Sequence, residues 1–167
     1  NSTNKAINCL VIVEGSGAVG VKQYYGSQMI NCTAVVPTGT TANGTAFQSA
    51  SGTNTINNCA SFGFTNATSG TTIGNYNATD AASGMPGANS QHSLTYADQF
   101  VSTTVDFKLK AGANLIAGCN TDATNAPNDI FGTARGSGTA GDIGCHEFVA
   151  AVVAILKIPI KIFRALA

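Results

Sequence analysis

Four charged residues near the end of the chain are its strongest candidates for a chemical role: Asp129, Arg135, Asp142 and Glu147. Carboxylates gathered in one place can hold a calcium ion, and a neighbouring arginine can act as a base. The alternative is structural, because the planar guanidinium of Arg135 can pair with Asp142 or Glu147 and fasten the end of the fold. The whole chain has only eight Asp and Glu residues, so we predict the structural role.

The histidines and cysteines of the sequence do not suggest a second candidate site. His92 and His146 are the two histidines of the sequence, and neither stands beside a nucleophile motif. Cys145 and His146 are neighbours on an expected extended segment, where successive side chains point to opposite faces, so we expect no Cys–His dyad. The chain has no C-x-x-C pair and an odd number of cysteines, which argues against a zinc site and a disulfide framework. We therefore predict no catalytic residue, no metal and no cofactor.

Composition narrows the class of protein. Charged residues make up 10% of the chain, against roughly 25% in an average soluble domain, and the formal net charge is zero. This balance argues against nucleic acid as a partner, because phosphate binding needs an excess of Lys and Arg. A hydrophobic content of 44% is enough to bury a core, so we do not expect disorder. Residues 65–93 are the exception: they are rich in Gly, Asn, Ser and Thr, and predict a loop-rich excursion.

An internal repeat sets the expected fold. The segments 7–13, 30–36 and 56–62 share an apolar residue, then Asn, then Cys, then a short β-prone run. The steps between these cysteines are 23 and 27 residues, which is the period of a solenoid built from short strands and turns. Asn fits a tight bend, stacked Asn amides can bond to one another as a ladder, and Cys can fill the core as a small apolar residue. The core and ladder positions are Asn8, Cys9, Asn31, Cys32, Asn58 and Cys59.

The end of the repeat region resembles a known family. The stretches D-F-K-L-K-A-G-A at 106–113, N-D-I-F-G-T-A-R at 128–135 and G-D-I-G-C-H-E-F at 141–148 resemble the C-terminal end of parallel β-helix proteins of the pectate-lyase-like superfamily. The sequence departs from the family pattern where Ala113-Asn114 replaces Ser-Pro and Cys145 replaces Ala. The resemblance implies an all-β fold, a single-stranded right-handed parallel β-helix over residues 1–148. The family includes carbohydrate-active enzymes, bacterial surface proteins and phage virion proteins, so the fold leaves the activity open.

The last segment, residues 149–167, has a different composition. It is almost entirely apolar, except for Lys157, Lys161 and Arg164, which would share one face of a helix that Pro159 kinks. We expect an α-helical tail that caps the fold, binds a partner or self-associates. The cations also allow a membrane-surface role, which we rank last, and the apolar run is too short for a membrane span. The predicted partner-binding residues are Val149, Val152, Val153, Ile155, Leu156, Ile160 and Phe163.

These features together favour a non-enzymatic scaffold. We expect a phage virion component, such as a capsid decoration, head fibre or tail spike, or another protein of a virion or cell surface, and a parent chain longer than this sequence. One alternative is a fragment of a polysaccharide lyase or hydrolase that uses Asp80 or Asp98. The other is an adhesin or glycan-binding module in which Tyr24, Tyr25 and Tyr76 stack on sugar rings.

Overall fold

The computed structural model describes residues 4–40, 44–120, 125–136 and 141–150. These residues form short strands and one short helix, α1 (Tyr96–Gln99). None of the described helices is long and apolar enough to cross a membrane. The strands are β1 (Lys5–Ile7), β2 (Leu10–Ile12), β3 (Val19–Tyr24), β4 (Gln28–Ile30), β5 (Thr33–Val35), β6 (Thr45–Ser51), β7 (Asn54–Asn57), β8 (Ala60–Phe62), β9 (Asn66–Ser69), β10 (Thr72–Asn75) and β11 (Ala78–Thr79).

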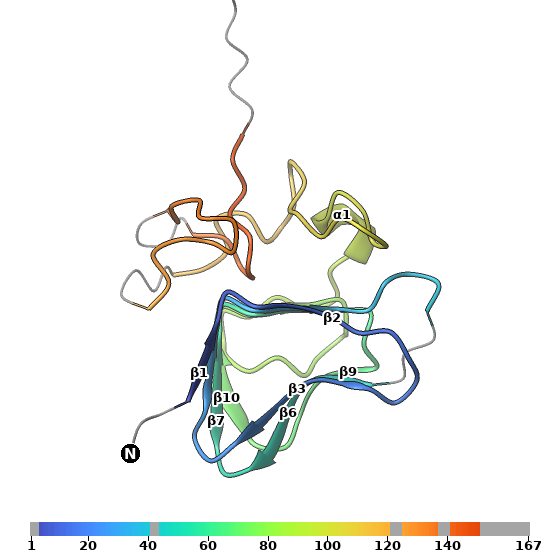
Figure 1. Cartoon of the computed structure of the whole chain (residues 1–167), viewed down its shortest axis with the longest axis vertical. Coiled ribbons are helices and arrows are strands. Elements are labelled where there is room, and N and C mark those ends of the chain that lie inside the picture. The colour runs from blue at the N-terminus through green and yellow to red at the C-terminus, as the bar shows by residue number, and fades with distance from the viewer. Residues whose placement is uncertain (1–3, 41–43, 121–124, 137–140, 151–167) are drawn as a thin grey trace, which may run out of the picture.

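The strands form three parallel sheets. Their orders are β1-β4-β7-β10 for the first sheet, β2-β5-β8-β11 for the second and β3-β6-β9 for the third. Each pass of the chain adds one strand to each sheet in turn, and in Figure 1 the strands of a sheet lie one behind another. The register holds from pass to pass, for example Ile7 beside Ile30 and Leu10 beside Thr33. The prediction of an all-β protein is thus confirmed, with parallel sheets compatible with a β-helix-like fold.

Left-handed bends join the first sheet to the second. Asn8, Asn31 and Asn58 have φ angles of 53°, 52° and 55°, a conformation that asparagine tolerates better than most residues. A fourth bend of the same kind falls on Tyr76, with φ of 54°. The sequence repeat therefore identified three bends correctly. It missed the fourth, because Tyr76-Asn77 stands there in place of Asn-Cys.

The expected excursion at residues 65–93 is wrong for its first half. Strands β9, β10 and β11 lie in this stretch and pair in parallel with β6, β7 and β8. Polar composition concealed them, because strands with small Thr, Ser and Asn side chains do not show the usual apolar alternation. The second half then covers the last strands: the N–H of Gln91 donates to the C=O of Asn77 at 2.7 Å.

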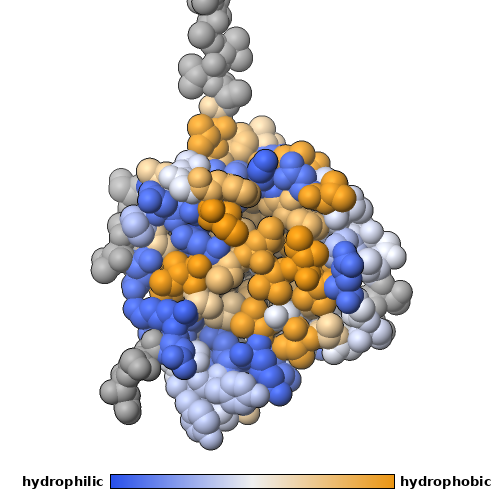
Figure 2. Space-filling view, in the orientation of Figure 1, coloured by the Kyte–Doolittle hydropathy of each residue, from blue (hydrophilic) through white to orange (hydrophobic). Residues whose placement is uncertain are grey.

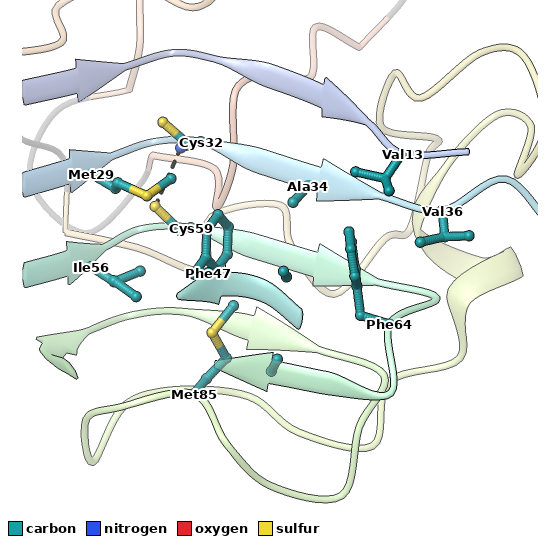
Figure 3. Close-up of a cluster of buried hydrophobic side chains, with 12 residues drawn as sticks. Val13, Met29, Cys32, Ala34, Val36, Phe47, Ile56, Cys59, Phe64 and Met85 are labelled. Carbon is teal, nitrogen blue, oxygen red and sulfur yellow. Dashed lines mark hydrogen bonds between the residues drawn. The ribbon is translucent and has the colours of Figure 1, made fainter. Parts of the chain in front are cut away.

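The inner core lies between the three sheets (Figure 3). Met29, Phe47 and Ile56 from three different strands are fully buried there. Cys32 and Cys59 are also fully buried, and the N–H of Cys32 approaches Cys59 Sγ at 3.4 Å. All five cysteines are free thiols, as expected for small buried residues. Cys9 is half-buried, since β1 and β2 lie at the edges of their sheets and no strand of the described residues pairs with their outer side.

Residues 94–120, 125–136 and 141–148 form a layer over the outer face of the second sheet, seen above β2 in Figure 1. Phe62 on β8 is the centre of this contact, with its ring centroid 5.3 Å from those of both Tyr96 and Phe100. Within residues 100–109 an antiparallel bridge joins Phe100 to Leu109. The side chains of Phe100, Phe107 and Leu109 pack against the sheet. Val105 between them is 85% exposed.

Candidate functional site

Arg135 is the centre of the candidate site. Its side chain is completely buried, and its Nη1 lies 3.3 Å from Glu147 Oε2. The same guanidinium donates to the backbone C=O groups of Asp142 at 3.2 Å and Gly144 at 2.8 Å. Nη2 also donates to Asn8 Oδ1 at 3.0 Å, which links the end of the covering layer to the first pass of the chain. Arg135 thus pairs with Glu147 and not with the Asp142 carboxylate.

The three carboxylates of the site are buried, and each of their oxygens accepts at least one backbone N–H group. Asp129, Asp142 and Glu147 are 6%, 2% and 7% exposed. The donors belong to Ala117, Phe131, Thr133, Gly136, Asp142, Glu147 and Phe148. Burial raises the pKa of Asp142, and the N–H donors from Phe148 and Ala117 oppose that shift. A calcium ion would have to compete with these backbone donors for the carboxylate oxygens, which makes the carboxylates poorer calcium ligands.

The predicted amide ladder does not form among the described asparagines of the bends. Asn8 Nδ2 donates to the C=O of Asn128 at 2.6 Å, and Asn58 Nδ2 donates to the C=O of Asn120 at 3.1 Å. Asn31, between them, is buried with neither amide atom hydrogen-bonded. The side-chain amides of Asn8 and Asn58 therefore bond to the covering layer and not to the equivalent asparagines of neighbouring passes.

A different set of asparagine contacts does run along the stack. Asn57 Oδ1 accepts the N–H of Asn75 at 2.9 Å, and Asn75 Oδ1 accepts the N–H of Asn89 at 2.9 Å. Asn77, the residue after the fourth bend, accepts the N–H of Cys59 at 2.9 Å. Each bond joins a side chain to the backbone of another pass. Asparagine side chains thus bond along the stack as predicted, but they are those of Asn57, Asn75 and Asn77 and not those of the bends.

The surroundings of Cys145 and His146 favour an unreactive thiol and a neutral, packed imidazole. Burial raises the pKa of the Cys145 thiol, which disfavours the reactive thiolate. Burial lowers the pKa of His146, and its Nδ1 accepts the N–H of Leu109 at 3.1 Å. That bond leaves the proton of the neutral ring on Nε2. The imidazole packs edge-on against Phe131, with ring centroids 5.6 Å apart, so it has a packing partner and no adjacent nucleophile in these contacts.

The residues of the two alternative functions are scattered. Asp80 Oδ2 accepts the N–H of Gly63 at 2.8 Å, and burial raises the pKa of this carboxyl. Asp98 lies elsewhere, in an exposed pair with Lys110 at 3.4 Å. Among the described residues no three His, Cys, Asp or Glu side chains gather as metal ligands would.

The tyrosines proposed for sugar stacking lie at different corners of the structure. Tyr24 ends β3, and Tyr25 follows it in the turn before β4, with 51% and 84% of their surfaces exposed. Tyr76 is half-buried at the bend between β10 and β11. The structure therefore does not bring the three rings to one corner.

An apolar groove was missed by sequence reasoning. It has a volume of about 350 Å³ and lies between β2 and the covering layer, with Ile12, Val105 and Phe131 in its walls. A hollow of about 490 Å³ adjoins it, shares Phe131 with it and extends to Val149. Figure 2 shows apolar side chains gathered over the middle of the face in view. The groove residues are far apart in the sequence, so no local pattern indicates them.

Of the predicted partner-binding residues, Val149 is described and is 65% exposed. Val152, Val153, Ile155, Leu156, Ile160 and Phe163 lie outside the described residues, as does the expected helix. Comparison with protein-family models, with curated proteins and with solved structures finds no match for this chain.

Proposed function

We propose that the chain is a single-stranded right-handed parallel β-helix, a solenoid related to the pectate-lyase-like superfamily, with its end closed by residues 128–148. The parallel register supports this proposal, because it is kept over successive passes in the first sheet. The recurrent left-handed bends support it as well. In this view the cluster of Asp129, Arg135, Asp142 and Glu147 is a structural lock on the last turn.

The proposed function is a non-enzymatic structural or binding scaffold, most concretely a phage virion component such as a capsid decoration, head fibre or tail spike. The observation that carries it is the use of the charged residues: every carboxylate of the strongest charged cluster is buried and bonded to backbone N–H groups. Active-site carboxylates need free lone pairs or exchangeable partners, and here the charge is used for structure. The low charge of the chain suits a role outside the cell or on a particle.

The proposed docking element is the tail, residues 149–167, which meets a protein partner or a second copy of the chain. Its many apolar residues need cover, because a large exposed apolar patch is unfavourable in water. In a helical arrangement Lys157, Lys161 and Arg164 would share one face and could remain in water. A surface glycan is a further possible partner. Nucleic acid is not expected, because the net charge is zero.

A tail variant tests this function. Ile155→Asp together with Leu156→Asp places two charges in the predicted binding residues, and is expected to weaken self-association by about tenfold or more. Sedimentation velocity over a range of concentrations measures the effect. Ile73→Asp is the matched control, because Ile73 on β10 is 53% exposed and lies outside the tail, so its association should be unchanged.

The same preparation tests the absence of enzyme activity. Incubation with acidic polysaccharides and calcium is expected to leave the polymer intact. Cleavage that disappears in Asp80→Ala or Asp98→Ala would overturn the scaffold proposal in favour of a carbohydrate-active enzyme. A chain that stays monomeric at all concentrations, with or without the tail substitutions, would remove the support for self-association through the tail.

A further inference from the structure

The apolar groove has the features of a binding surface. Three of its large apolar side chains are partly or largely exposed: Ile12 by 49%, Phe131 by 60% and Val105 by 85%. They come from β2 and from two separate parts of the covering layer, and they converge on one hollow. Soluble proteins rarely leave such a cluster open to water unless it meets a partner.

The walls of the groove are held in place by specific contacts. The backbone N–H of Ile130 donates to the C=O of Cys145 at 2.9 Å, and Phe131 packs against His146. Lys108 Nζ lies 5.5 Å from the centre of the Phe131 ring, with its ammonium over the ring face. A ring fixed from two sides keeps the groove open, which lowers the entropy cost of binding.

The chain itself supplies an apolar segment of the required kind. Val149 lines the hollow that adjoins the groove, and residues 151–167 follow it directly. Thus each copy carries a groove and an apolar segment that starts at its edge. Residues 149–156 contain no Gly, Asn or Pro, the residues that allow a chain to reverse direction within a few positions. Without these turn-forming residues, a path from Val149 toward a neighbouring copy is favoured over an immediate reversal into the groove of the same copy.

We propose that residues 151–167 of one copy bind in the apolar groove of a second copy. This inference rests on the proposed docking role of the tail and names its receptor. Exchange in both directions gives a closed two-fold dimer, in which each tail buries its apolar residues against Ile12, Val105 and Phe131 of the other copy. The charged groups Lys157, Lys161 and Arg164 remain at the rim, in water.

A complementation experiment tests the inference with full-length chains. Variant one, Val105→Asp with Phe131→Asp, keeps the tail and loses the groove. Variant two, Ile155→Asp with Leu156→Asp, keeps the groove and loses the tail. Each alone is expected to dimerise at least tenfold more weakly than the unchanged chain, and an equimolar mixture should recover a one-to-one dimer joined by a single tail. The control is Ile73→Asp, which leaves both elements intact.

The outcomes separate the inference from the function on which it rests. If the tail substitutions weaken assembly and the groove substitutions do not, the tail binds elsewhere, so the inference is wrong while the proposed function stands. If neither pair of substitutions changes assembly, the inference is wrong and the tail does not mediate self-association. Binding of the tail to its own groove is detected with Phe163→Trp, since the chain has no other Trp. A blue-shifted emission in a strictly monomeric chain, lost on adding Phe131→Asp, would contradict exchange between copies.

Discussion

Replacement of Arg135 by Met is expected to lower the free energy of unfolding by about 3–5 kcal/mol, because it leaves a buried carboxylate without its partner. The guanidinium of Arg135 is fully buried and forms an ion pair with the carboxylate of Glu147. Its loss also leaves the C=O groups of Asp142 and Gly144 without these donors. Urea denaturation followed by circular dichroism measures the change.

An exposed pair provides the control for this effect. Lys110 and Asp98 are 3.4 Å apart, with 38% and 63% of their side chains exposed. Lys110→Met is expected to cost about 1 kcal/mol or less, because exposed ion pairs contribute little. A loss below about 1 kcal/mol for Arg135→Met would show that the cluster does not stabilise the fold.

Phe62→Ala is expected to cost about 3–5 kcal/mol, through lost burial and the cavity left behind. The side chain is fully buried on β8 and contacts both Tyr96 and Phe100 of the covering layer. The same denaturation experiment measures the loss. Because Phe62 joins the sheet to the layer, we also expect weaker protection of the layer's amides from hydrogen exchange.

The matched control for Phe62 is an exposed apolar residue on a neighbouring sheet. Ile73→Ala is expected to change stability by less than about 1 kcal/mol, because 53% of Ile73 already contacts water. Equal losses in the two variants would mean that the covering layer does not depend on the Phe62 contact.

The bends were predictable because they constrain residue type locally. A left-handed residue at Asn8, Asn31 and Asn58 favours asparagine, and the regular step between passes repeats the signal. Tyr76 was not predictable, because an aromatic residue at positive φ is held by its surroundings and not by its own preference. Strands β9 to β11 were not predicted for a related reason. They are stabilised by hydrogen bonds to β6, β7 and β8, and their polar side chains give no apolar pattern in the sequence.

The candidate site was predictable as a set of residues and not as a geometry. The family-like pattern identified Asp129, Arg135, Asp142 and Glu147, and all four are buried in the structure. The contact from Arg135 to Asn8 could not be predicted, because nothing in the sequence tells which pass of the chain the covering layer meets. The hydrogen bonds from the amides of Asn8 and Asn58 could not be predicted either, because they depend on where the covering layer lies.

We propose that the Arg135 cluster fastens the end of the covering layer to the first pass of the chain through the hydrogen bond to Asn8. A double-mutant cycle between Asn8→Gly and Arg135→Met tests it most directly, because glycine keeps the left-handed bend and removes only the amide. Unfolding free energies of the four proteins give the coupling between the two side chains. We predict a coupling of about 1 kcal/mol or more, whereas losses that add to within about 0.3 kcal/mol would contradict the claim.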